Sequence, residues 1–308
     1  MYDVVLLTDA RYLVPKADNN YISNVILEDQ LVAKALQEKG LSVVRKAWDD
    51  AQFDWKSAKF ALFRATWDYF DRFDEFFRWL NRTKEMTRFI NSAPLITWNI
   101  DKHYLEELHS KKINIPKTFF VEKGSRLSLR EGIQKAQEQH LFNTVDVVLK
   151  PCIAGAARNT FKINRNQIED FEWRFQNLVA KEAMMLQEFQ ANIVSEGELS
   201  LIFFQGKFSH AVLKRAKAGD FRVQDDYGGS VHVYHPSKTE IDFANTVVHA
   251  CPELPVYARV DIFRDNEGNW ALAELEIFEP ELWFRNKPEA AHELATIISN
   301  KINYEKVL

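Results

Sequence analysis

Short apolar runs alternate with stretches of helical spacing over the first hundred residues, and this pattern restricts the fold more than any other feature. Residues 3–8, 41–47 and 59–64 are apolar runs of strand length. A helical stretch lies between the first two runs, and another covers residues 71–80, whereas the polar residues 9–20 predict a loop. Strands that alternate with helices form βα units around a parallel sheet. The amino-terminal part therefore predicts a parallel α/β domain.

The pattern changes after Pro94, where short strands and helices mix. We expect residues 1–97 to form the parallel domain, residues 98–184 a small α+β subdomain, and residues 185–308 a strand-rich α+β subdomain. A helix over residues 289–302 is expected to close the chain. No linker rich in glycine and serine separates these parts, so we expect them to pack as one compact α/β enzyme.

Charge and cysteine content exclude several classes of protein. The 40 basic and 44 acidic residues give a formal charge of −4, so no overall basic field can hold a nucleic-acid backbone. Cys152 and Cys251 lie far apart, which argues against a disulfide framework or a thiolate zinc site. The amino-terminal apolar run is far shorter than the roughly 20 residues of a membrane span. We expect a cytoplasmic enzyme without a nucleic-acid or membrane partner.

Two common nucleotide-binding fingerprints are absent. The chain contains no G-x-x-x-x-G-K-[ST] loop and no G-x-G among its ten glycines. This excludes the P-loop and the Rossmann dinucleotide motif. Three separated segments instead contain what a magnesium-nucleotide site needs, and their combination and order carry the information.

The first segment covers residues 147–163. A buried strand ends with Lys150, and a loop of small residues that includes Gly155 follows it. Short side chains let backbone N–H groups approach phosphate oxygens, and a lysine adds a point charge. A surface lysine ahead of an ordinary hairpin turn is the alternative.

The second segment is the apolar strand of residues 183–189, which ends with Gln187, Glu188 and Phe189. The edge of such a strand can pair with an adenine through main-chain hydrogen bonds, while apolar side chains cover the ring. Taken alone, this segment is more often a core strand. Glu198 follows, and it is either a partner for a ribose hydroxyl or a solvated turn residue.

The third segment holds three carboxylates on two neighbouring strands. Glu274 and Glu276 are two residues apart and share one face of a predicted strand, and Asp261 on the partner strand can face them. Like charges among apolar neighbours are costly to bury, and Mg²⁺ offsets that cost because it prefers carboxylate, phosphate and water oxygens. The alternative is a solvated outer face of the sheet.

In these segments the chain resembles the ATP-grasp superfamily, within it the prokaryotic glutathione synthetase-like branch. Residues 148–155 look like its second phosphate lysine and flexible loop, and residues 99–102, which we expect to open a helix, look like the segment of its first. The resemblance implies that Lys102 and Lys150 hold phosphates and that residues 185–189 bind adenine. It also implies magnesium ligation by the three carboxylates, with Glu276 in a position where asparagine is usual.

Two further segments support the resemblance. Residues 214–224 with Gly228-Gly229 resemble the basic strand and glycine pair of the superfamily, which implies that Lys214 and Arg222 contact phosphate or acyl phosphate. The element Phe63-Arg64-Ala65-Thr66-Trp67-Asp68-Tyr69 looks like one in cycloserine-pathway ATP-grasp relatives. The resemblance is clear from residue 99 to residue 280 and more general in the first domain.

The resemblance implies a ligase that uses ATP and Mg²⁺, with one or two ions and with Mn²⁺ as a substitute. A carboxylate attacks the γ-phosphate to give an acyl phosphate, and an amine then attacks the activated carbonyl. The expected substrates are a small amino acid or peptide and an amine, and the resemblance suggests a homodimer. The alternatives are a small-molecule kinase on the same scaffold and a non-catalytic nucleotide-binding domain.

Substrate recognition is expected in the first domain. Arg64, Trp67 and Asp68 stand at the end of a predicted strand. Ligands of open α/β sheets lie outside the carboxyl ends of the strands, so these side chains are candidates for binding a zwitterionic amino acid. An ordinary junction between strand and loop explains them nearly as well.

Overall fold

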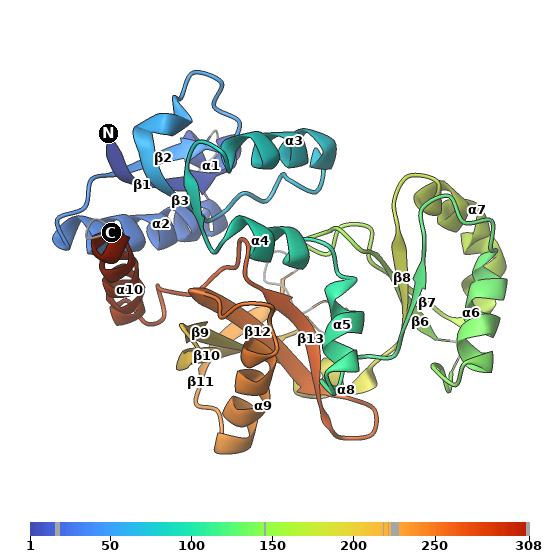
Figure 1. Cartoon of the computed structure of the whole chain (residues 1–308). Coiled ribbons are helices and arrows are strands. Elements are labelled where there is room, and N and C mark those ends of the chain that lie inside the picture. Colours follow the sequence, from blue (N-terminus) through green and yellow to red (C-terminus); the bar gives the residue numbers. More distant parts are fainter. Residues whose placement is uncertain (16–18, 145, 218, 221, 223–227, 306–308) are drawn as a thin grey trace.

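The computed structural model describes residues 1–308 except 16–18, 145, 218, 221, 223–227 and 306–308, and its elements are arranged as three sheets with flanking helices (Figure 1). The strands are β1 (Tyr2–Thr8), β2 (Val43–Ala47), β3 (Ala58–Phe63), β4 (Arg88–Ile90), β5 (Thr118–Val121), β6 (Val147–Pro151), β7 (Phe161–Ile163), β8 (Met184–Glu188), β9 (Glu198–Phe204), β10 (Lys207–Arg215), β11 (Ser230–Tyr234), β12 (Tyr257–Arg264) and β13 (Trp270–Glu276). The α-helices are α1 (Ala10–Leu13), α2 (Asn20–Glu38), α3 (Phe73–Thr83), α4 (Ala93–Asn99), α5 (Tyr104–Ser110), α6 (Leu129–Glu138), α7 (Ile168–Val179), α8 (Ala191–Glu196), α9 (Lys238–His249) and α10 (Glu289–Glu305). None of these described helices is long and apolar enough to cross a membrane.

The first sheet is parallel, with strand order β2-β1-β3-β4. Successive side chains of a strand point to opposite faces. Val4 and Leu6 therefore pack against α2 and α10, whereas Val5 and Leu7 pack against the aromatic side chains of α3. Both faces are thus covered, which explains why the strands read as continuous apolar runs. The predicted parallel α/β domain at the amino terminus is confirmed.

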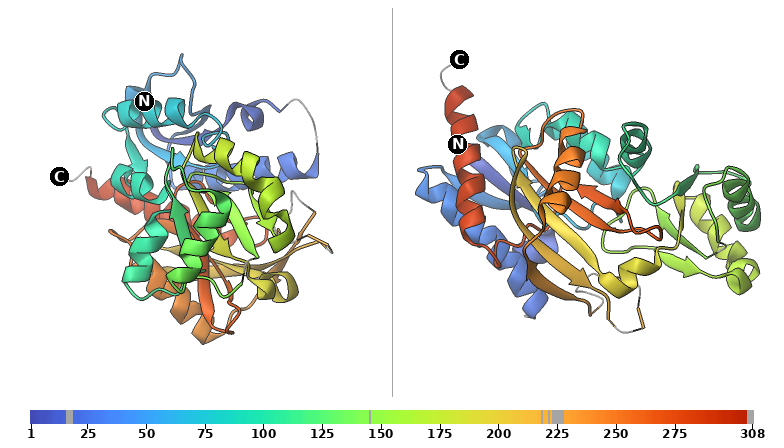
Figure 2. Two further views of the ribbon diagram at one scale, coloured as in Figure 1. Left: turned by 90° about the vertical axis from the view of Figure 1, so that its right-hand side faces the viewer. Right: turned by 90° about the horizontal axis from the view of Figure 1, so that it is seen from below.

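The second sheet is antiparallel, with order β5-β8-β6-β7, and α6 and α7 cover one of its faces (Figure 1). This unit stands apart from the other two sheets in the right-hand view of Figure 2, and it lies in front of them in the left-hand view. β8 is an interior strand, because Leu186 is in register with Phe119 on one side and with Leu149 on the other. The sheet thus extends to Glu188, beyond the predicted subdomain boundary at residue 184.

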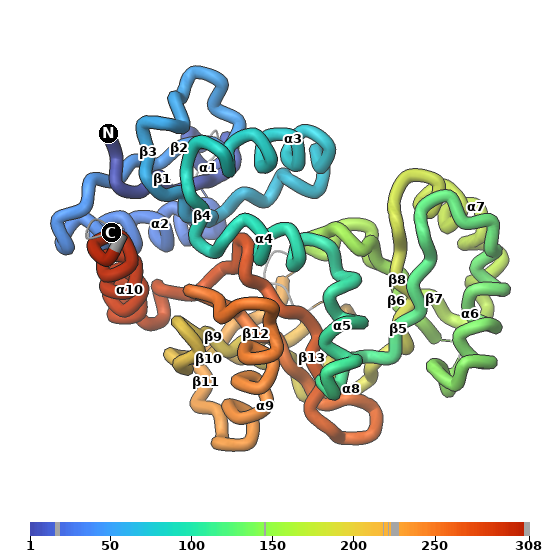
Figure 3. The backbone as a smooth tube through the Cα atoms, in the orientation of Figure 1, coloured from blue at the N-terminus to red at the C-terminus, as the bar shows by residue number. Residues whose placement is uncertain are grey.

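The third sheet is antiparallel, with order β11-β10-β9-β12-β13. Leu201, Val260 and Leu272 of this sheet share an apolar cluster with Val247 and Val248 of α9. α10, which follows β13 in the chain, packs instead against α2 of the amino-terminal unit (Figure 3). The carboxy-terminal helix is therefore packed against the amino-terminal unit.

Four of the described α-helices, α1, α4, α8 and α9, were missing from the predicted elements. The stretch 9–20, predicted as a loop, contains α1, whose N-cap Asp9 accepts a hydrogen bond from the backbone N–H of Arg11 (2.8 Å). α9 begins with a capping box formed by Ser237 and Glu240. That S-x-x-E spacing is a readable helix-start signal in the sequence.

His210 of β10 gives the fold a dependence on pH. Its Nε2–H donates to the carbonyl oxygen of Leu282 (2.8 Å), and burial lowers its pKa from the ordinary 6.5 to about 4. Between these two values the unfolded chain binds a proton that the native protein does not bind. The contribution of neutral His210 to stability is thus fully present above pH 6.5 and is lost as the pH falls towards about 4.

We expect urea unfolding of the wild type to show this loss over that interval. His210→Gln should show a smaller loss, because glutamine keeps a donor but does not titrate. The same pH dependence in both proteins would contradict the assignment.

Candidate nucleotide and metal site

A cavity of about 620 Å³ opens where the three sheets meet. Its wall includes Tyr12 and Trp67 of the amino-terminal unit, Lys150 and Phe189 of the second unit, and Asp261 of the third. It therefore collects side chains from all three predicted parts of the chain. A concave site of this size with converging polar groups is typical of small-molecule binding.

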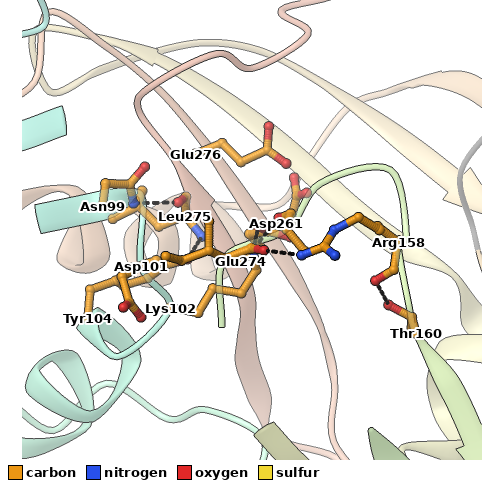
Figure 4. Close-up of polar contacts among 12 residues, drawn as sticks. Asn99, Asp101, Lys102, Tyr104, Arg158, Thr160, Asp261, Glu274, Leu275 and Glu276 are labelled. Carbon is orange, nitrogen blue, oxygen red and sulfur yellow. Dashed lines mark hydrogen bonds and ion pairs between the residues drawn. The ribbon is translucent and has the colours of Figure 1, made fainter. Parts of the chain in front are cut away.

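The three predicted metal ligands meet on one side of this cavity (Figure 4). Asp261 of β12 is directly opposite Glu274 of β13 in the antiparallel register, and Glu276 follows on the same face of β13. All three offer only carboxylate oxygens, which are the donors that Mg²⁺ prefers. The donor set thus fits a magnesium ion.

The turn between α4 and α5 holds the edge strand β13 in place. Asn99 donates to the carbonyl oxygen of Leu275 (2.7 Å) and accepts from the backbone N–H of Ile277 (3.0 Å). The hydroxyl of Tyr104 accepts from the N–H of Leu275 (2.9 Å). Because these bonds satisfy the open edge of the strand, they fix the positions of the carboxylates that it carries.

Arg259 belongs to the same cluster and was missed in the sequence. Its guanidinium donates to Asp261 (2.8 Å) and also to Glu276, its cross-strand partner. Burial alone would raise the pKa of Asp261, but Arg259 and Lys214 bring that pKa well below its ordinary value. The sequence did contain a signal for Arg259: it stands two positions before Asp261, and residues two apart in a strand share one face.

Lys102 lies in the turn between α4 and α5, not at the start of a helix as expected. Its ammonium is 3.0 Å from Glu274 and donates to the carbonyl oxygen of Ala154 (2.6 Å). Its backbone N–H donates to the carbonyl oxygen of Cys152 (2.9 Å), so the two predicted phosphate-binding segments are in direct contact. Burial lowers the pKa of Lys102, but Glu274 outweighs this and raises it.

Lys150 stands near the end of β6 and lines the cavity. Its ammonium forms no hydrogen bond or ion pair with any residue that the structure describes. Burial lowers its pKa, and Lys102 acts in the same direction. A partly buried cation without a partner is well suited to receive an anionic group such as a phosphate.

The loop after Lys150 is held against the amino-terminal unit. A Cβ atom on Gly155 would lie 2.8 Å from Cε1 of Phe70, so only glycine allows this close approach. Arg158 is paired with Glu182 (3.0 Å) and donates to the carbonyl oxygen of Ile153 (2.9 Å). These contacts place the loop over the cavity, which it lines from Ala154 to Arg158.

The predicted adenine-binding residues line the cavity, but not as a strand edge. β8 is hydrogen-bonded to a strand on each side, so its main chain is already satisfied. Gln187 donates to the hydroxyl of Thr118 (2.8 Å), and Glu188 accepts from the N–H of Asn143 (2.6 Å). The expectation of a free edge at β8 was therefore wrong.

The basic residues of β10 and the following segment also reach the cavity. Lys214 is paired with Glu198, its register partner on β9, and with Asp261 (2.9 Å). Burial raises the pKa of Glu198, although Lys214 opposes this. Arg222 is paired with Asp220 (2.7 Å). Other parts of the predicted basic element, residues 218, 221 and 223–227, lie outside the described residues.

Of the three predicted substrate residues, Trp67 lines the cavity, but Arg64 and Asp68 do not. The side chain of Arg64 is only 3% exposed and faces the carboxylate of Asp29 (3.4 Å). Asp68 accepts from Trp48 (2.6 Å) and from Arg72 (2.9 Å). The geometry gives Arg64 and Asp68 structural contacts, so it does not support substrate contact by either.

Glu279 is a second cavity residue that was missed in the sequence. It follows β13, three residues beyond Glu276, and accepts a hydrogen bond from the indole N–H of Trp67 (2.9 Å). Burial raises its pKa to about 7, and Glu274 adds to that effect. The only sequence signal was its closeness to the two acidic residues of β13.

Comparison with known proteins begins with the amino-terminal unit. Residues 4–91 match the domain family described as the N-terminal domain of D-cycloserine synthetase DcsG. Over 291 residues the chain is 26% identical to the cycloserine biosynthesis protein DcsG of Streptomyces lavendulae, which covers 87% of this chain and 92% of that protein.

Solved structures extend the similarity to the whole chain. The crystal structure of D-cycloserine synthetase DcsG matches with a TM-score of 0.83 at 24% identity, over 97% of this chain and 99% of that one. The structure of the ATP-grasp ligase PsnB, complexed with minimal precursor, Mg and ADP, matches with a TM-score of 0.61 at 14% identity, over 97% of this chain and 98% of that one. The structure of D-alanine–D-alanine ligase from Bacillus anthracis, complexed with ATP, matches with a TM-score of 0.63 at 14% identity, over 99% of this chain and 100% of that one.

Proposed function

The chain has the ATP-grasp fold, and from this premise we propose that it is an ATP-dependent carboxylate–amine ligase. It forms an amide bond through an acyl phosphate and releases ADP and phosphate, and its substrates are a small amino acid or peptide and an amine. The resemblance to ATP-grasp enzymes found in the sequence is confirmed. All three similar proteins are named as synthetases or ligases.

One observation carries the proposal. Lys102, Lys150 and the carboxylates of Asp261, Glu274 and Glu276 come from segments up to 174 positions apart (276 − 102) and line one cavity. Phosphoryl transfer requires positioning and charge neutralisation rather than a covalent nucleophile. This cavity provides cations for phosphates and oxygen ligands for a divalent ion, and these are the groups that such a transfer needs.

Each residue has a separate role in the proposal. Lys102 and Lys150 hold the phosphates of ATP, and Asp261, Glu274 and Glu276 hold Mg²⁺. When bound, the ion neutralises charge on the γ-phosphate and on the leaving diphosphate. The loop that contains Gly155 covers the phosphates and keeps water from the acyl phosphate.

The other charged residues support these groups. Lys214 holds Asp261 and Glu198 in position, and Arg222 stabilises the transferring phosphoryl group. Gln187, Glu188 and Phe189 surround the adenine, and Glu198 accepts a ribose hydroxyl. We further propose that two Mg²⁺ ions can bind, that Mn²⁺ substitutes for them, and that the enzyme is a cytoplasmic homodimer, as the resemblance suggests.

ADP formation by the purified protein tests the function. With Mg²⁺ and ATP, we expect ADP only when an amino acid or dipeptide and an acceptor amine are both present, together with an amide product in mass spectra. Lys150→Ala should remove the activity. ADP formation driven by a hydroxyl compound alone would favour a kinase. ATP binding without ADP formation in the presence of any tested amino acid, dipeptide or amine would contradict the ligase.

A further inference from the structure

Aromatic side chains surround one end of the cavity, on the wall formed by the amino-terminal unit. The rings of Tyr12 and Trp67 are in edge-to-face contact at 5.7 Å, and Tyr21 packs on both at about 6.5 Å. All three rings line the cavity together with Glu279.

Glu279 differs from the three carboxylates that we assign to Mg²⁺ in its ion pairing. Glu274 is paired with Lys102, Glu276 with Arg259, and Asp261 with Arg259 and Lys214. Glu279 forms no ion pair with any residue in the described parts of the chain. A partly buried carboxylate outside any ion pair is unfavourable, and the positive charges of Arg259 and Lys102 act on Glu279 only from longer range, so its position in the cavity favours a cationic ligand.

The structure fixes Glu279 at this place. The indole N–H of Trp67 donates both to the carboxylate (2.9 Å) and to the backbone carbonyl of Glu279 (3.0 Å). Arg64 donates to the carbonyl oxygen of the next residue, Pro280 (3.4 Å). Two residues of the amino-terminal unit thus hold the segment after β13, and the side chain of Tyr69 also hydrogen-bonds to Glu279.

The surroundings favour an organic ammonium over a metal ion. A divalent ion prefers several oxygen ligands and water, whereas an ammonium group is attracted both by a carboxylate and by the faces of aromatic rings. Trp67 connects Glu279 with the rings of Tyr12 and Tyr21. A carboxylate beside three aromatic rings therefore matches a primary ammonium group.

We propose that Glu279, with Trp67, Tyr12 and Tyr21, forms the subsite that binds the ammonium group of an amino-acid substrate. This inference rests on the proposed function, and it narrows the substrate to a compound that carries a free ammonium group. Glu279 contacts the substrate, and Trp67 is a positioning residue that orients Glu279.

Matched pairs of ligands test the subsite directly. Isothermal titration of the full chain with Mg²⁺ and a non-hydrolysable ATP analogue compares four amino acids with the 2-hydroxy acids of the same side chains: alanine with lactate, serine with glycerate, aspartate with malate, and phenylalanine with phenyllactate. We expect at least one amino acid to bind about tenfold more tightly than its hydroxy acid.

Variants separate binding from folding. Glu279→Gln keeps the shape of the side chain and should weaken the binding of that amino acid about 30-fold. The affinities for the hydroxy acid and for the ATP analogue should stay unchanged. Trp67→Phe should reduce the preference for the amino acid more weakly. Asp71→Asn is the matched control, because it removes an exposed carboxylate from the same cavity wall, and it should leave the preference unchanged.

Three results would overturn the inference: equal affinity for both members of every pair, no binding of any amino acid by protein that binds the ATP analogue, or a loss of the analogue's Mg²⁺-dependent binding in Glu279→Gln. The last result would place Glu279 in the metal site. Amino-acid binding without ADP formation would instead contradict the ligase while it supports the subsite, so the two failures are distinguishable.

Discussion

Glu274→Gln is expected to lower kcat/KM for ADP formation by about 10²–10³-fold, because it removes one carboxylate that a divalent ion needs during phosphoryl transfer. Glutamine keeps the size of the side chain but not its charge. The change also leaves Lys102, which is 6% exposed, without the carboxylate at 3.0 Å. Both effects disturb the γ-phosphate end of the site.

Steady-state rates over a range of Mg²⁺ concentrations check this prediction. The variant should require more Mg²⁺ for half-maximal activity. Glu267→Gln is the matched control, because Glu267 is exposed in the turn between β12 and β13 and should leave the rate unchanged. Wild-type activity and Mg²⁺ dependence in Glu274→Gln would refute the metal site.

Arg64→Ala is expected to destabilise the protein by about 3–5 kcal/mol, which is the cost of removing one partner from a buried ionic cluster. Arg64 lies 3.4 Å from Asp29 and 3.9 Å from Glu28, and its guanidinium packs on the ring of Phe284 at 5.4 Å. Among the described residues, Asp29 would keep only Arg45 as a cationic partner. The buried negative charge would then be poorly compensated.

Urea unfolding measures this loss. Arg130→Ala is the control, because Arg130 is paired with Glu169 on the surface and such a pair contributes about 1 kcal/mol or less. If Arg64→Ala were as stable as the wild type but had a raised KM for the amino acid, the sequence-based expectation of substrate contact would be correct and the structural role wrong.

Local patterns in the sequence were sufficient to predict many of the helices and strands and several of their buried faces. The apolar runs of the first domain predicted β1, β2 and β3 to within two residues. The spacing of two between Glu274 and Glu276 placed both on one face of a strand, since side chains alternate along β structure. Periodicity of this kind depends only on neighbouring residues, so it can be read without the fold.

The fold decided which side chains meet. Arg64 and Trp67 were expected to contact substrate. In the structure, Arg64 donates to Pro280, 216 positions away, and Trp67 donates to Glu279, 212 positions away. These two bonds hold the segment that contains Glu279. The edge expected at β8 is covered by β5 and β6. The sequence by itself determined the strands, the lysine at the end of β6 and the shared face of the carboxylates. Only the tertiary structure decided the partners, because pairing, burial and charge balance depend on contacts between distant segments.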